Sequence, residues 1–265
     1  MTVLDTTRRN PARTMLNKVP EVTIFFWIIK IMATTVGETA ADFLNTNLKL
    51  GLTGTTVLMA VLLIAALVFQ FRSRRYIPVV YWLVVVLISV VGTLITDNLT
   101  DNFGVSLWTA TTIFFIAMIA SFTGWFASEK TLSIHTITTT RREAFYWSSI
   151  LFTFALGTAA GDLIAEKLDL GYWKSGLLFG ALIALVVASR FWFKLNAVAA
   201  FWVAYVLTRP LGASIGDYLT AAKADGGLGV ATYAVSALFL TTIIGLVVYF
   251  TVEQKRQPSE LLRAR

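Results

Sequence analysis

One pattern recurs four times in this chain and limits its fold more than any other feature. An aromatic residue is followed by Trp, a glycine comes ten residues after that Trp, and an aspartate comes five residues after the glycine. The pairs are Phe26-Trp27, Tyr81-Trp82, Tyr146-Trp147 and Phe201-Trp202; the glycines are Gly37, Gly92, Gly157 and Gly212; the aspartates are Asp42, Asp97, Asp162 and Asp217. The first and third copies are 120 residues apart, as are the second and fourth, which indicates a unit duplicated twice.

The composition is that of an integral membrane protein. Hydrophobic residues make up 57% of the 265-residue chain, charged residues 14%, and the mean hydropathy is +0.73. Sustained apolar runs of about 20 residues predict membrane-spanning helices and not barrel strands, whose signal would be short and alternating. Eight spans are predicted, at residues 22–44, 53–71, 78–99, 105–127, 144–166, 172–193, 197–220 and 229–252.

The basic residues predict how these spans are oriented. Sixteen Lys and Arg residues fall on the side that carries both termini and four on the other side, which predicts cytoplasmic termini. Each repeat holds two spans, so all four repeats insert the same way up. We therefore expect an all-α fold of eight transmembrane helices, built from four parallel two-helix repeats in two tandem four-helix halves, with spans one, three, five and seven as an inner bundle.

The same reasoning divides the chain into five segments. They are a cytoplasmic N-terminal tail (1–20), a first four-helix half with repeats 1 and 2 (21–128), a cytoplasmic linker (129–142), a second half with repeats 3 and 4 (143–252), and a cytoplasmic C-terminal tail (253–265).

Residue usage excludes several classes of function. The chain has no cysteine and one histidine, His135, so thiolate and His-rich metal sites are excluded. No nucleophile–base pair and no ATP-binding motif is recognisable, so we expect no enzyme activity and no organic cofactor. Four equivalent acids at helix ends fit an aspartyl protease poorly. Topology explains the net charge of +7, so no nucleic-acid partner is expected.

The four aspartates are the candidate site. Each lies near the C-terminal end of its helix, where the partial negative charge of the helix makes an acid unfavourable. A shared cation would relieve this repulsion, and Glu38 would add a fifth acid. Neutral oxygens and embedded cations that could support the site are Thr35, Thr39, Thr93, Thr96, Asn98, Ser214, Arg209 and Lys30. An all-oxygen set favours Mn²⁺, Mg²⁺ or Ca²⁺. Acids that only mark helix ends and face water are the alternative.

The other intramembrane features also leave alternatives open. Glu38 breaks the repeat, so it either binds the ion or a coupling proton, or pairs with Lys30 or Arg209. Lys30 could instead reach the cytoplasmic surface. Arg209 precedes Pro210 and serves either structural ion pairing or gating. The glycines favour close helix packing, and the aromatic-Trp pairs favour an interfacial belt.

Most of the chain, including Gly157-Thr158-Ala159-Ala160-Gly161-Asp162 in the second half, resembles a known family. The run Lys18-Val19-Pro20-Glu21-Val22-Thr23, followed by Gly37-Glu38-Thr39-Ala40-Ala41-Asp42, resembles uncharacterised bacterial multi-pass "membrane-anchored proteins" with Gly-Glu-Thr-x-x-Asp repeats. The resemblance implies a bacterial inner-membrane location and a link to metal-ion homeostasis, including manganese export.

These observations together predict a membrane transporter of a divalent metal cation, with Mn²⁺ as the first candidate substrate. The resemblance implies export, and the residues themselves leave the direction of transport open. A sensor or scaffold that does not transport, and whose acids only organise the bundle, is the alternative. The expected partners are the lipid bilayer and the metal ion, and a homo-oligomer is left open.

Overall fold

The computed structural model describes residues 17–47 and 49–263, with side chains to residue 253. Within these ranges it contains helices and no strands, and eight helices are long and apolar enough to cross a membrane. They are α2 (Ile24–Asn47), α3 (Gly51–Arg72), α4 (Pro78–Asp97), α5 (Leu107–Glu129), α6 (Thr140–Asp162), α7 (Tyr172–Trp192), α8 (Ala197–Thr220) and α9 (Thr232–Arg263). The predicted all-helical, eight-span fold is confirmed.

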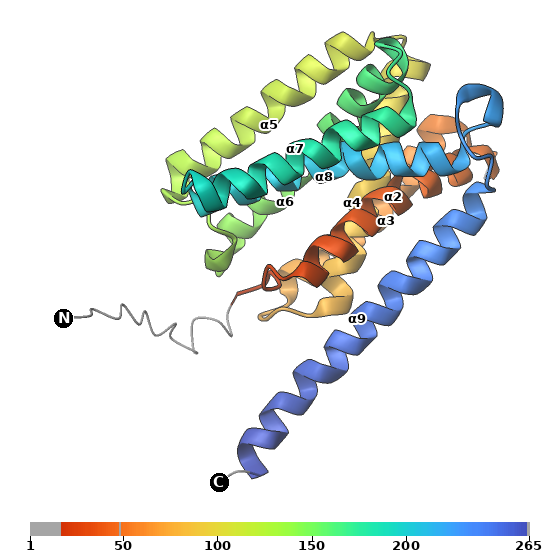
Figure 1. The fold of residues 1–265 in the computed structure, drawn as a ribbon. Coiled ribbons are helices and arrows are strands. Elements are labelled where there is room, and N and C mark those ends of the chain that lie inside the picture. The colour runs from red at the N-terminus through yellow and green to blue at the C-terminus, as the bar shows by residue number, and fades with distance from the viewer. Residues whose placement is uncertain (1–16, 48, 264–265) are drawn as a thin grey trace.

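Two of the predicted segments lie partly outside this description. Residues 1–16 of the N-terminal tail, with the basic residues Arg8, Arg9 and Arg13, are outside the described residues, as are residues 264–265. The C-terminal tail predicted from residue 253 continues α9, whose far end stands away from the other helices (Figure 1). The linker between the halves holds a short 3-10 turn, Ile134–Thr136, on which His135 is exposed.

The first helix of each repeat belongs to an inner bundle and the second lies outside it. Within their most apolar stretches, the inner helices α2, α4, α6 and α8 are 56–72% buried, whereas α3, α5, α7 and α9 are only 11–22% buried. The inner helices pack in the cyclic order α2, α4, α6, α8 and back to α2. The sequence prediction of an inner bundle made of spans one, three, five and seven is therefore confirmed.

Each outer helix packs mainly against the inner helix of the next repeat and not against its own. Thus α3 packs on α4, α5 on α6, and α7 on α8, while α9 returns to the start of the chain and packs on α2 (Figure 1). This arrangement interlocks the four repeats, because removing any one of them would expose apolar surface on its neighbours.

The repeated glycines set the distance between inner helices. A Cβ atom added at any of them would overlap an atom of the next inner helix, so only a residue without a side chain fits there. The facing pairs are Gly37 with Ser89, Gly92 with Phe154, Gly157 with Arg209, and Gly212 with Thr34. Every partner lies three positions before the glycine of its own repeat, so the four contacts are equivalent around the ring.

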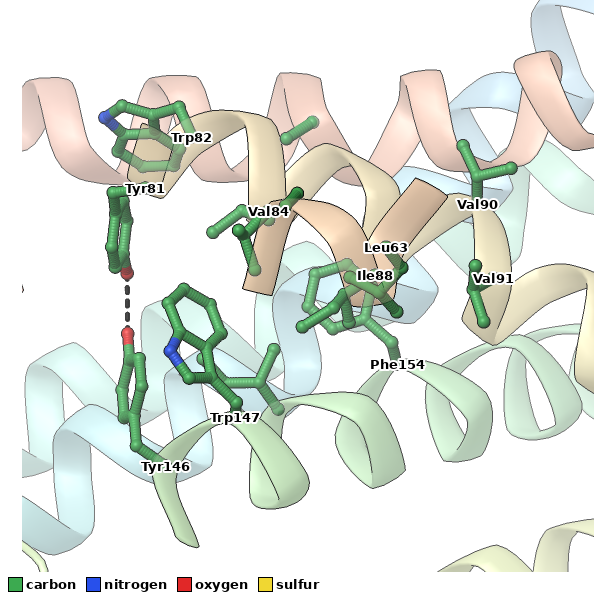
Figure 2. Packing of buried hydrophobic residues seen from close by; sticks show 14 of the residues in the cluster. Leu63, Tyr81, Trp82, Val84, Ile88, Val90, Val91, Tyr146, Trp147 and Phe154 are labelled. Carbon is green, nitrogen blue, oxygen red and sulfur yellow. Dashed lines mark hydrogen bonds between the residues drawn. The ribbon is translucent and has the colours of Figure 1, made fainter. Parts of the chain in front are cut away.

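The aromatic-Trp pairs form a second set of equivalent contacts at the other end of the inner helices. The first aromatic residue of each pair packs against the Trp of the next repeat, with ring centroids 5.4–6.1 Å apart. Most of these rings are buried, so the interfacial belt predicted for them is wrong: the inner bundle is wide enough to enclose them. Tyr81 and Tyr146 join the two halves through a 2.6 Å hydrogen bond between their hydroxyls (Figure 2).

A buried ion pair ties the segment before α2 to the second half of the chain. Lys18 Nζ donates to Glu143 at 2.6 Å and to the carbonyl oxygen of Phe71 at 3.1 Å. The second carboxylate oxygen of Glu143 accepts a bond from Gln70 at 2.9 Å. Three segments distant in sequence therefore meet at one carboxylate.

Candidate charged site in the inner bundle

Arg209 lies at the centre of the inner bundle and is completely buried. It occupies the position three residues before Gly212, where the other repeats carry Thr34, Ser89 and Phe154. Gly157 on α6 provides the space for its side chain, since a Cβ atom there would overlap the β and γ carbons of Arg209. The guanidinium is thus held where no water reaches it.

Every inner helix other than its own contributes an oxygen to this guanidinium. Arg209 Nη2 donates to Glu38 on α2 at 2.7 Å, to Thr158 on α6 at 2.7 Å, and to Thr93 on α4. Nη1 donates to the carbonyl oxygen of Thr34 at 3.0 Å. Glu38, Thr93 and Thr158 each directly follow their repeat glycine, and the fourth equivalent position is Ala213, on α8 itself. The repeat symmetry has produced one central oxygen-lined cation site, and Arg209 fills it.

This geometry shows which of the two basic residues pairs with Glu38. Its carboxylate forms the buried ion pair with Arg209, and Thr93 donates a further, longer hydrogen bond of 3.4 Å to the same oxygen. A buried charge is stable only when it is paired and hydrogen-bonded, and this pair satisfies the condition for Glu38. The ion pair predicted with Arg209 is present, and the one with Lys30 is not.

Lys30 is the second buried basic residue of the inner bundle. Its Nζ lies 4.0 Å from the ring centroid of Phe154 and 4.3 Å from that of Tyr205. Within the described part of the chain, Nζ has no hydrogen-bond acceptor. The prediction that Lys30 reaches the cytoplasmic surface is wrong, because its side chain is fully enclosed by the inner bundle. The Phe154 ring also lies beneath the Arg209 guanidinium, at 5.8 Å, so both basic side chains contact one aromatic ring.

The four repeat aspartates lie beyond Arg209, at the end of the bundle that we call the aspartate end. All four are half-buried, and each lies four residues after the position that Glu38, Thr93, Thr158 and Ala213 occupy in their repeats. About one helical turn therefore separates the aspartates from the residues that surround the Arg209 guanidinium. The backbone widens into π-helical turns directly after Asp97 and Asp162, at Asn98–Asn102 and Leu163–Lys167. Such turns are rare in proteins, and those that occur are often found at functional sites.

The aspartates do not form a ready-made metal centre. Among the described residues, no three Asp, Glu, His or Cys side chains are grouped so that they could hold a metal ion. The prediction that Asp42, Asp97, Asp162 and Asp217 share one cation therefore stays a prediction, and it requires their carboxylates to move together.

Several predicted supporting oxygens are engaged elsewhere. Thr39 bonds to Ser236 on α9 at 2.7 Å, and Thr96 donates to the carbonyl oxygen of Ala155 on α6 at 3.1 Å. Thr35 donates to a carbonyl of its own helix, and Asn98 bonds to Thr53 and Thr56 on α3. The hydroxyl of Ser214 is buried and has no partner among the described residues. Of the predicted neutral oxygens, only Thr93 contacts the central charge.

Three contributors to the site were missed by sequence reasoning: Thr158, Phe154 and the backbone carbonyl of Thr34. Thr158 is an ordinary threonine in an apolar helix, and Phe154 looks like any other core aromatic residue. The signal that could have identified Thr158 is its place in the repeat, directly after Gly157 and equivalent to Glu38. The backbone carbonyl of Thr34 carries no sequence signal at all.

A comparison with known protein families agrees with the four repeats of the sequence and the fold. The family model described as "Repeat of Unknown Function (DUF347)" matches residues 25–76, 80–131, 145–196 and 200–256. The chain belongs to this repeat family. Each DUF347 match holds one inner helix and the outer helix that follows it, so the four repeats predicted from sequence are confirmed. No curated protein and no solved structure matches the chain.

Proposed function

We propose that this DUF347 protein is a membrane transporter of a divalent metal cation, with Mn²⁺ as the first candidate substrate. One observation carries the proposal: four equivalent, half-buried aspartates lie about one helical turn beyond the position of Glu38, at the same end of four membrane-spanning inner helices. Acids in membrane helices are costly and are kept where they bind ions or protons. Among the described acids, Arg209 pairs with the carboxylate of Glu38 alone, so a cation bound at the aspartate end would offset the negative charge of the aspartates.

The chemistry of the donors supports a hard cation. The aspartate end offers carboxylate, hydroxyl and carbonyl oxygens, the donors preferred by Mn²⁺, Mg²⁺ and Ca²⁺. The same proposal includes a location in the bacterial inner membrane and export as the direction of transport, both of which rest on the family resemblance. It also includes cytoplasmic termini, which rest on the distribution of basic residues. With no ATP-binding motif in the chain, an ion gradient or a partner would supply the energy.

The packing implies that transport needs a conformational change. On the side of Arg209 away from the aspartates, the inner bundle is filled by the side chains of Lys30, Phe154 and Tyr205, all completely buried. In the form described here, the path is therefore closed between the aspartate end and the aromatic rings. A transporter that alternates between two forms fits this arrangement.

A flux assay tests the proposal. Purified protein in liposomes should carry Mn²⁺ in the presence of an ion gradient, and Asp162→Asn should reduce the rate at least tenfold. Asp225→Asn is the matched control and should leave the rate unchanged, because Asp225 is an exposed acid in the loop between α8 and α9 and is not at the repeated aspartate position. Equal transport by parent and all four Asp→Asn variants would refute the proposal.

A sensor or scaffold is the second candidate function. It is favoured by the filled core and by the absence of a preformed metal group among the described residues. In that case liposomes would show no flux with any divalent cation, and the Asp→Asn variants would raise the thermal stability by removing repulsion between carboxylates.

A further inference from the structure

The oxygens around Arg209 form a site whose parts come from three separate helices, α2, α4 and α6. One carboxylate, two hydroxyls and one backbone carbonyl converge on the guanidinium, and each comes from another helix or another position of the repeat. Such a set is the usual environment of a bound cation and not of a single structural ion pair. In this structure the guanidinium of Arg209, a side chain of the protein itself, occupies the site.

The site does not satisfy all the hydrogen-bond donors of Arg209. Arg209 Nε is buried without an acceptor, although a guanidinium offers five donors in a fixed fork. Lys30, the neighbouring basic residue, is also without an acceptor among the described residues, and both lie against the Phe154 ring. Because its Nε is unpaired within that part of the chain, Arg209 would lose fewer hydrogen bonds on leaving the site than a fully bonded guanidinium would.

We propose that Arg209 is a tethered cation that closes the central site, and that an external cation can take its place at Glu38. The proposal rests on the proposed function for its role in transport: a cation that enters at the aspartate end must displace the guanidinium before it can pass. The binding site itself does not depend on transport, and its ligand class is a small monovalent cation able to hydrogen-bond, with guanidinium as the closest match. An arginine that leaves its site in this way acts as a gate.

The first experiment replaces the tethered cation with a free one. Arg209→Ala removes the guanidinium and leaves its oxygens in place, so guanidinium chloride at a few millimolar should raise the melting temperature of the purified variant by several degrees. Sodium and tetramethylammonium chloride at the same ionic strength should not. The parent protein should not respond, because its site is full, and the double variant Arg209→Ala/Glu38→Gln should not respond, because its carboxylate is gone. Denaturation by guanidinium requires far higher, molar concentrations.

A folded Arg209→Ala protein that ignores guanidinium would overturn the proposal. The variant is to be expressed and purified with guanidinium present, so that the site can be refilled during folding. Failure to obtain folded protein even then would also count against a site open to external cations.

A second experiment loosens the gate without removing it. Thr158→Val deletes one acceptor of Arg209 and keeps the shape of the side chain, so a displaceable guanidinium would leave more readily. The apparent affinity for Mn²⁺, measured by thermal stabilisation, should then rise by roughly tenfold for the loss of one charged hydrogen bond. Thr153→Val is the control, since Thr153 is buried on the same helix and bonds only to its own helix, at the carbonyl of Ile150.

The two experiments separate the inference from the proposed function. Guanidinium rescue without Mn²⁺ binding or flux would support the tethered-cation site and refute the metal transporter. Mn²⁺ flux with no guanidinium rescue, and with Thr158→Val and Thr153→Val behaving alike, would leave the transporter standing and refute the gate.

Discussion

Phe201 of the last repeat packs against Trp27 of the first, with ring centroids 5.5 Å apart. Three equivalent aromatic contacts join each earlier repeat to the next one along the chain. The contact of Phe201 with Trp27 is the fourth, so the chain closes into a ring of four equivalent units. Because the ring is closed, α2 and α8 are neighbours although about 170 residues separate Thr34 from Thr208. The ion pair of Glu38 and Arg209 is possible only because of this closure.

The close approach of inner helices predicts a strong effect of a single methyl group. Gly37→Ala should lower the free energy of unfolding by about 1–3 kcal/mol, because the new Cβ would overlap both the side chain and the backbone of Ser89. Thermal unfolding in detergent measures this. Gly245→Ala on α9 is the control: nothing lies within 4 Å of the added Cβ, so the better helix former should leave stability unchanged or raise it. Equal effects at the two positions would contradict the packing argument.

The hydroxyl pair between the two halves predicts non-additive mutations. Tyr81→Phe or Tyr146→Phe alone should cost about 1–3 kcal/mol, since each leaves the other hydroxyl buried without a partner. The double variant should cost less than the sum of the two, which a double-mutant cycle of unfolding free energies detects. Tyr205→Phe is the comparison, because its hydroxyl already lacks a partner among the described residues and its loss should be neutral or stabilising. Additive losses would show that the pair is not coupled.

The buried amine of Lys30, which has no hydrogen-bond acceptor among the described residues, predicts a stabilising substitution. Lys30→Met should raise the free energy of unfolding by about 1–3 kcal/mol, because burying a polar group without an acceptor costs roughly that much. Methionine keeps the length of the side chain and its contacts with Phe154 and Tyr205. Lys223→Met, at an exposed loop position, should change stability little. A large loss of stability in Lys30→Met would mean that the two ring contacts outweigh the cost of burial.

The donor set predicts a rank order of metals. Mn²⁺, Mg²⁺ or Ca²⁺ should raise the melting temperature of the purified protein, because a ligand that binds only the folded state stabilises it by mass action. A chelator should reverse the effect, and the Asp42→Asn variant should weaken it. Cu⁺, which prefers sulfur, should have a smaller effect on a chain that has no cysteine. Stabilisation by Cu⁺ alone would refute the hard-cation site.

Periodicity was sufficient to predict the helices, their number, the repeats and the inner bundle. The reason is that a membrane helix must be apolar along its whole length, which leaves an unmistakable trace in the sequence. The repeat offset also placed the four aspartates at the same end of the inner helices. Two interpretations of the sequence were wrong. Aromatic residues early in a span are typical of the membrane interface, yet Tyr81 and Tyr146 are fully buried, and Lys30 is enclosed by the inner bundle instead of reaching the cytoplasmic surface.

What the sequence by itself determined was therefore the set of equivalent positions, because duplication repeats residue types at fixed spacings. What only the tertiary structure decided was which helices are neighbours in the ring, and so which of those positions meet. Arg209 could have paired with any of five acids by spacing alone, and the closed ring selected Glu38. Spacing along one helix fixes the direction in which a side chain points, but a contact between helices depends on packing across about 170 residues of chain, which no local pattern encodes.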